Sequence, residues 1–128
     1  MFSIIIPTFN NLDYLKLCIK SIRQNSIYNH QIIPHVNIGE DGTCDFLQDE
    51  NIDFTFTKYN SGICEGMNTA SKKSKFKYIL YSHDDFYFCP GWDDVLKKEV
   101  DVIGHNNFYL SGVIMNNGLI KFNAGSDI

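Results

Sequence analysis

The chain has 128 residues, which fits one domain able to bury its own core. Hydrophobic residues make up 44% and charged residues 20% of it, with a formal net charge of −4, values that exclude a disordered chain. The mild negative charge also argues against a nucleic-acid-binding protein, which needs clustered lysines and arginines to neutralise phosphates.

Apolar runs and turn residues predict strands and helices that alternate along the chain. The first run, residues 2–9, is rich in isoleucine and predicts a strand buried on both faces, as in a parallel sheet. Apolar residues at helical spacing then predict a helix up to Ile22, with Asn11 or Asp13 as its N-cap. Further strands are predicted at 31–38, 52–59, 78–81, 108–115 and 119–122, and further helices at 46–50, 64–74 and 93–103.

This order of elements predicts an α/β fold. We expect a single domain over residues 1–128, with a mostly parallel sheet flanked by helices. An Asn-Asn-Gly turn at residues 116–118 predicts a terminal β-hairpin. The exposed edge of that hairpin, over residues 108–122, suggests a homo-oligomer, here a dimer.

The cysteines and the lengths of the apolar runs indicate the cellular compartment of the protein. Cys18, Cys44, Cys64 and Cys89 form no CxxC pair, so we expect no zinc knuckle but free thiols that behave as small buried hydrophobes. We expect no signal peptide, because the first residues form a strand-like apolar run without a preceding basic segment, and the apolar runs are far shorter than the roughly 20 residues that a membrane span needs. We therefore expect no membrane span and a reduced, cytoplasmic location.

Acidic residues directly after the strand at 78–81 are the sharpest chemical signal. Ligands of an open α/β sheet bind at the carboxyl ends of its strands, and this strand runs into Asp84 and Asp85. Adjacent carboxylates repel each other and favour a cation, which takes its other ligands from phosphates and water. The sequence therefore predicts a divalent metal beside a nucleoside diphosphate, although either acid could instead cap a turn before Pro90.

Other strand ends carry residues with two interpretations each. Phe9 is either core or a stacking surface for a nucleobase. Asp41 is either an ordinary loop acid or an acceptor for the ring N–H of a uracil. Gly62 and Gly66 allow close approach of the backbone, Asn68 either contacts the ligand or caps a turn, and His83 is either bound to backbone or a ligand.

Five segments together resemble the nucleotide-binding part of a family 2 glycosyltransferase with the GT-A fold. They are SIIIPTFN (3–10), YLKLCIKSI (14–22), GEDGTCD (39–45), NSGICEGMN (60–68) and YILYSHDDFYFCPGW (78–92). The fold that this resemblance implies is a Rossmann-like nucleotide-diphospho-sugar transferase fold. The acceptor-binding part would be short or missing in this chain.

The resemblance also implies a role for each matching position. Pro7, Thr8 and Phe9 would hold the base, and Asp41 would bind its edge. Asn60, Gly62, Gly66 and Asn68 fall on a segment that lies beside the diphosphate and sugar. Asp84 would face the ribose, and Asp85 would bind Mn²⁺ or Mg²⁺.

Three residues depart from the family pattern. His83 replaces the first acid of an Asp-x-Asp motif, Glu40 stands for the first acid of Asp-Asp, and Met67 sits where many members have arginine. No residue is assigned as the catalytic base, because the acids at 93, 94, 99 and 101 lie on a helix where a solvated face is expected and Asp127 is at the frayed end.

The implied activity is metal-dependent transfer of a sugar, with inversion, from a nucleoside-diphosphate sugar to an acceptor hydroxyl. A UDP-sugar is the favoured donor, and the acceptor is a glycan, lipid or protein. Two alternatives stay open, a non-catalytic nucleotide-sugar-binding module and a sugar nucleotidyltransferase. The second usually has a glycine-rich basic loop after its first strand, where this chain has PTFNN.

Overall fold

The computed structural model describes residues 1–112, 114–116, 119–121 and 126–127. Contacts divide the chain into two compact units, Met1–Val95 and Leu96–Ile128, which are described separately below. That the whole chain forms one domain stays a prediction.

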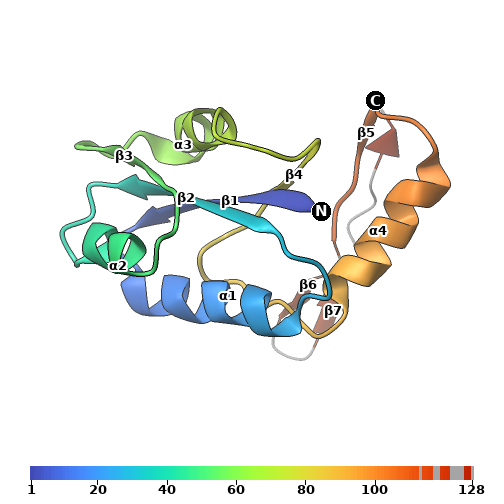
Figure 1. Cartoon of the computed structure of the whole chain (residues 1–128), viewed down its shortest axis with the longest axis horizontal. Helices are drawn as coiled ribbons and strands as arrows, with labels where there is room; N and C mark the ends of the chain where they lie inside the picture. Colours follow the sequence, from blue (N-terminus) through green and yellow to red (C-terminus); the bar gives the residue numbers. More distant parts are fainter. Residues whose placement is uncertain (113, 117–118, 122–125, 128) are drawn as a thin grey trace. The chain divides into compact units, whose positions relative to one another are not determined.

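The first unit is built on a four-stranded parallel sheet (Figure 1). Its strand order is β3-β2-β1-β4, with β1 Phe2–Phe9, β2 Gln31–Asn37, β3 Thr55–Thr57 and β4 Tyr78–Tyr81. The predicted α/β class and parallel sheet are confirmed. The isoleucines of β1 explain its central place, because Ile4, Ile5 and Ile6 are fully buried. Each such burial stabilises the fold by about 1.5–3 kcal/mol relative to exposure.

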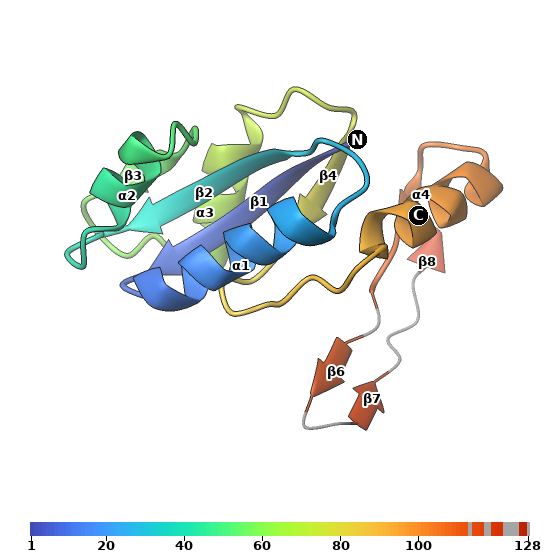
Figure 2. The same ribbon diagram turned by 60° about the horizontal axis from the view of Figure 1, so that its bottom comes forward.

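Helices cover both faces of this sheet, with α1 Leu12–Asn25 on one face and α3 Gly62–Ser71 on the other (Figures 1 and 2). The buried stripe of α1 has the predicted helical spacing and consists of Leu15, Cys18, Ser21 and two isoleucines, Ile19 and Ile22. On the opposite face, Ala70 and Met67 of α3 pack against Ile5 and Ile33. The short helix α2, Thr43–Asp49, links β2 to β3 and begins after Gly42, whose φ is 86°.

Several bounds differ from the sequence prediction. The helix predicted at 46–50 spans Thr43–Asp49, the helix predicted at 64–74 spans Gly62–Ser71, and the strand predicted at 108–115 is replaced by two short strands at Phe108–Tyr109 and Ile114–Asn116. The predicted strand 52–59 shortens to Thr55–Thr57, because the Ile52 amide donates to the Leu47 carbonyl and closes the end of α2 instead of joining the sheet. Of the two predicted N-caps of α1, Asn11 is the N-cap residue and Asp13 lies in the first turn. Asn11 holds the cap position without a side-chain cap hydrogen bond, and the Leu12 amide donates instead to Asp41, 2.9 Å away.

The helix α4, Trp92–Ile103, begins at the end of the first unit and continues into the second. In the second unit β5, Phe108–Tyr109, pairs antiparallel with β8, Ser126–Asp127, and β6, Ile114–Asn116, pairs antiparallel with β7, Leu119–Lys121. Residues 117 and 118 of the predicted turn lie outside the described residues, so the terminal hairpin stays a prediction. None of the described helices is long and apolar enough to cross a bilayer.

Candidate functional site

The carboxyl edge of the sheet joins β1 to the acids that follow β4. The Thr8 hydroxyl donates to Oδ2 of Asp84 at 2.8 Å, and Thr8 is only 3% exposed. The Ser82 amide donates to the Ile5 carbonyl, which extends the pairing of β4 with β1 up to these acids. Asp84 is therefore fixed against the central strand, whereas the neighbouring Asp85 is exposed to solvent.

The end of β1 also presents an aromatic ring. Phe9 is 49% exposed, so the interpretation of this residue as core is wrong. Its register partner in β2 is Asn37, and Pro7 before it is half-buried. Beyond the strand, Asn10 has a φ of 43°, and Ile38 at the end of β2 has a φ of 68°. Such conformations cost about 1–3 kcal/mol and cluster at functional sites, and these two lie at one edge of the sheet.

Asp41 lies after β2 and already has intramolecular partners. Its Oδ2 accepts from the Leu12 amide at 2.9 Å, and its Oδ1 accepts from the amide and the hydroxyl of Thr43. Partial burial raises the pKa of Asp41, but the hydrogen bonds from Thr43 and Leu12 outweigh burial and bring the pKa below its ordinary value. Asp41 is thus a carboxylate at neutral pH that ties α1 to α2, and its contact with a base stays a prediction.

The third group of predicted residues lies on α3 and the loop before it. The Gly62 amide donates to Oδ1 of Asn60 at 3.1 Å. Gly62 has a φ of 76°, and a Cβ added there would meet no atom within 4 Å, so space lies open above its backbone. Gly66 differs, because its close approach is to the ring of His35 within the protein, where an added Cβ would lie 2.8 Å from Cδ2. Asn68, further along α3, is exposed.

His83 is held among aromatic rings. Its Nε2 lies 3.2 Å from the Tyr81 hydroxyl, and its ring centroid lies 5.1 Å from that of Tyr81 and 4.8 Å from that of Phe86. Burial raises the pKa of the Tyr81 hydroxyl, and Cys64, Asp84 and Asp85 raise it further.

The acids at this edge are the candidate ligands of a metal ion. Nowhere in the described residues do three or more histidine, cysteine or acidic side chains gather as metal ligands. An exposed Asp85 beside a fixed Asp84 still fits a cation that is shared with a bound diphosphate. Mg²⁺ in such sites uses one or two carboxylates and takes its remaining ligands from phosphates and water.

Two buried polar clusters were missed by the sequence analysis. His35 and Asn37 in β2 contact the loop before α3, and their polar character within an apolar strand was the available signal. Asp93 was expected on a solvated helix face, but it is fully buried. It accepts from the amides of Ile27 and Tyr28 and lies 2.9 Å from Nε2 of His30.

The buried cluster around Asp93 fixes the loop between α1 and β2. Because the Phe2 amide donates to Nδ1 of His30, the proton of a neutral imidazole lies on Nε2 and points at Asp93. Burial raises the pKa of Asp93, but the Tyr28 and Ile27 amides and His30 outweigh burial and bring the pKa below its ordinary value.

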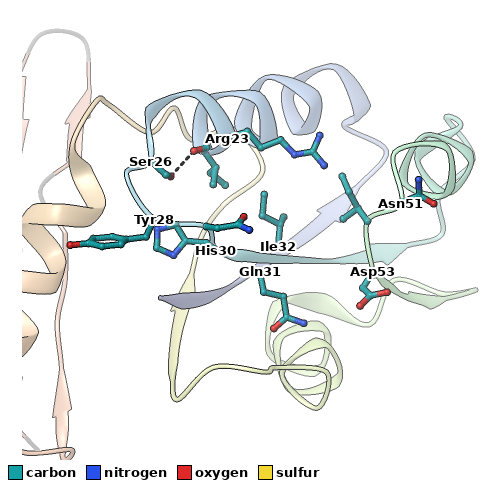
Figure 3. Close-up of a pocket in the computed structure, with 11 residues that line it drawn as sticks. Arg23, Ser26, Tyr28, His30, Gln31, Ile32, Asn51 and Asp53 are labelled. Atoms are coloured by element: carbon teal, nitrogen blue, oxygen red, sulfur yellow. Dashed lines mark hydrogen bonds between the residues drawn. The ribbon is translucent and has the colours of Figure 1, made fainter.

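A depression of about 340 Å³ lies at the other end of the sheet (Figure 3). It is lined by the end of α1, the start of β2 and the loop before β3, with Arg23, Gln31 and Asp53 among its polar residues. Arg23 pairs with Glu50 at 2.9 Å. The depression is therefore at the amino end of β2, whereas ligands of parallel sheets bind at the carboxyl ends.

The parallel sheet, with helices on both faces and polar residues at its carboxyl edge, defines an open α/β fold whose ligands bind at that edge. Residues 3–119 match the family described as Glycosyl transferase family 2, and the chain belongs to this family. It is 28% identical over 88 residues to "Putative teichuronic acid biosynthesis glycosyltransferase TuaG" of Bacillus subtilis. The aligned region is 65% of this chain and 35% of TuaG. An "Uncharacterized glycosyltransferase" of Rickettsia felis is 31% identical over 94 residues, 67% of this chain and 15% of that protein. The chain thus spans about a third or less of the length of these relatives.

Solved structures establish the GT-A-like fold. Residues 1–349 of TarS from S. aureus, solved in complex with UDP, superpose with a TM-score of 0.74 at 19% identity, over 92% of this chain and 37% of that one. The mannosyltransferase PcManGT from Pyrobaculum calidifontis, solved with GDP-Man and Mn²⁺, gives a TM-score of 0.67 at 15% identity, over 84% of this chain and 33% of that one.

Proposed function

We propose that this chain forms the donor-binding part of a metal-dependent glycosyltransferase. The reaction is transfer of a sugar, with inversion, from a nucleoside-diphosphate sugar to a hydroxyl of a glycan, lipid or protein, and a UDP-sugar is the favoured donor. The observation that carries the proposal is that an exposed aromatic ring, Phe9, and the acids Asp84 and Asp85 follow or end two adjacent strands at the same edge of the sheet. The similar folds of TarS, solved with UDP, and of PcManGT, solved with GDP-Man and Mn²⁺, support it.

In this proposal each part of the edge binds a different part of the donor. The base stacks on Phe9, with Pro7 and Thr8 beneath it and Asp41 at its edge. The ribose meets Asp84, which Thr8 holds in place. The diphosphate and sugar approach Asn60, Gly62 and Asn68, where the open space above Gly62 leaves room for phosphate oxygens.

Asp85 would hold Mn²⁺ or Mg²⁺ against the diphosphate. When bound, such a cation neutralises the charge of the departing diphosphate. The chain's own residues bind and orient the donor, so that the anomeric carbon faces the acceptor. Activation of the acceptor hydroxyl needs a general base, and we assign that role to no residue of this chain. A cytoplasmic location and a homo-oligomer formed through residues 108–122 belong to the same proposal.

Calorimetric titration with UDP and with GDP, each in Mn²⁺ and in EDTA, tests the proposal. We expect one nucleotide to bind in Mn²⁺, and we expect binding to fall at least about tenfold in EDTA and in Asp85→Ala, a loss of about 1.4 kcal/mol. Asp53→Ala is the matched control, because it removes an exposed acid at the opposite end of the sheet. If neither nucleotide binds in either condition, the proposal fails. If a nucleotide does bind, release of free sugar from the corresponding nucleotide sugar would separate a transferase from a binding module.

A further inference from the structure

Two polar side chains are buried in β2 under the start of α3. His35 is 0% and Asn37 is 3% exposed, and both lie at positions flanked by apolar neighbours in a central strand. Their register partners are Pro7 and Thr55 for His35, and Phe9 and Thr57 for Asn37. Burial of a polar group is unfavourable unless it is hydrogen-bonded, so the partners of these two residues indicate what they do.

The partners converge on Ser61, the residue between Asn60 and Gly62. Oδ1 of Asn37 accepts from the Ser61 amide at 2.8 Å and from the Ser61 hydroxyl at 2.7 Å. Nε2 of His35 lies 3.2 Å from the Ser61 hydroxyl oxygen. Asn37 and His35 therefore hold both the backbone and the side chain of the residue that precedes α3.

The directions of these hydrogen bonds fix the protonation of His35. The Ser61 hydroxyl gives its single proton to Asn37, and the Thr57 hydroxyl gives its own to the Tyr59 carbonyl at 2.8 Å or to Oδ1 of Asn37 at 3.3 Å. Both hydroxyl oxygens must then accept from His35, which places a proton on Nε2. Nδ1 is left to accept from the Thr55 hydroxyl at 2.7 Å. A neutral imidazole with its proton on Nε2 satisfies all of these contacts.

We propose that His35 and Asn37 are positioning residues for donor binding, and that they hold the Asn60–Gly62 segment in its binding conformation only while His35 is neutral. This inference rests on the proposed function, in which that segment meets the diphosphate and sugar. It adds a residue pair that touches no donor atom, together with a dependence on pH.

The surroundings of His35 disfavour its charged form. Burial lowers the pKa of His35, and the hydrogen bond with Asn37 and the charge of Glu65 on α3 offset only part of this. The neighbouring strands contribute uncharged groups, Pro7 from β1 and Thr55 and Thr57 from β3. A proton added at Nδ1 would meet the hydroxyl that now donates to it, and would leave a buried cation with no carboxylate in hydrogen-bond contact.

The sign of the pH effect follows from this lowered pKa. The unfolded chain binds a proton at His35 more readily than the folded one, so the contribution of neutral His35 is complete above about pH 6.5. It is lost progressively as the pH falls below that value. Donor affinity should therefore weaken on acidification, because order in the Asn60–Gly62 segment is lost with it.

Titration calorimetry with UDP-glucose and with GDP-mannose in Mn²⁺, between pH 8 and pH 5, tests the inference. A sugar-linked diphosphate has no phosphate proton to gain in this range, unlike free UDP. Because the pKa of His35 in the folded chain lies below its ordinary value, we expect the donor affinity of the wild type to weaken toward the acid end of this range. We expect His35→Gln, which carries no titrating group, to bind more weakly at pH 8 and with a flat pH profile. The control His105→Gln, in the second unit, should keep the wild-type slope.

A second variant covers the case in which His35→Gln does not fold. Ser61→Ala changes a half-buried loop residue and removes one of the two hydroxyls that accept from His35, the one that links it to the segment. We expect it to lose about fivefold in affinity at pH 8, equivalent to about 1 kcal/mol for a hydrogen bond, and to lose most of the pH slope. Equal slopes in wild type and Ser61→Ala would overturn the inference and leave the proposed function intact. Absence of binding to either nucleotide sugar at pH 8 would overturn both.

Discussion

Thr8 and Asp84 are joined by a hydrogen bond of 2.8 Å although 76 positions separate them in the sequence. The bond connects the end of β1 to the residue pair that follows β4. It leaves Asp85 as the exposed member of the pair. One acid is thus fixed by the fold, and the other is free to meet a ligand.

Thr8→Val should weaken donor binding by about fivefold, because Asp84 loses the donor that orients it, at about 1 kcal/mol. Thr8→Ser keeps a hydroxyl at the same place and should bind within about twofold of the wild type, as expected when the hydrogen bond survives. Calorimetric titration with the nucleotide that binds the wild type gives both numbers. If the Thr8→Val and Thr8→Ser variants bind the nucleotide equally well, the orientation of Asp84 has no part in donor binding.

Phe9→Ala should lower the affinity for the nucleotide by about tenfold, within the 1–3 kcal/mol measured for base stacking on aromatic rings. The ring is half exposed, so the free energy of unfolding should change by less than about 1 kcal/mol. Ile27→Ala removes an apolar side chain that is 65% exposed near the end of α1 and should leave binding unchanged. Unaltered affinity in Phe9→Ala would exclude this ring as the base platform.

Asp93→Asn should lower the free energy of unfolding by about 2–3 kcal/mol, because a buried carboxylate loses hydrogen bonds that a neutral amide cannot fully replace. The lowered pKa means that the contribution of Asp93 is complete above about pH 4 and is lost as the pH falls through the folded value. Urea unfolding at pH 7 and at pH 3 should therefore show a smaller difference between variant and wild type in acid. A difference that stays constant would contradict the pKa direction. Asp53→Asn, at an exposed position, is the control.

Gly66→Ala should destabilise the protein, although alanine is the better helix former by about 1 kcal/mol. The added Cβ would lie 2.8 Å from Cδ2 of His35, and crowding of a packed interior costs about 1–3 kcal/mol. Gly112→Ala serves as the control, because a Cβ added at Gly112 would meet no atom within 4 Å. Thermal unfolding at pH 8 compares them, and a rise in Tm for Gly66→Ala would show that His35 can move away at little cost.

The elements that the sequence predicted well are those whose signal is local. The bounds of β1 and β4 match, because each apolar run ends at polar or turn residues. The prediction for β3 was too long, because the alternation of residues 52–59 does not reveal that Ile52 closes α2. The acids after β4 were found from their position alone, yet the attachment of Asp84 to Thr8 depends on sheet order, which no local pattern encodes.

Predictions about burial failed where partners come from distant segments. The charge pattern of α4 places Asp93 among acids expected in solvent, but the loop at Ile27 and Tyr28 supplies two amides that bury it. Two cysteines expected to be buried, Cys64 and Cys89, are exposed. His35 was passed over because a histidine in a strand gives no sign of the hydroxyls that will surround it.

The four cysteine thiols differ in exposure and therefore in expected reactivity. Burial raises the pKa of Cys18 to about 12, despite a hydrogen bond from Ser82, and burial followed by the charges of Asp45 and Asp41 raises that of Cys44. Because the thiolate is the reactive form, alkylating reagents should modify the exposed Cys64 and Cys89 and spare the other two. Cys64 lies two residues after Gly62, in the first turn of α3. With Cys89 changed to serine, a dye can be attached beside the segment proposed to receive the diphosphate, and ligand-induced changes there become visible in fluorescence without any introduced cysteine.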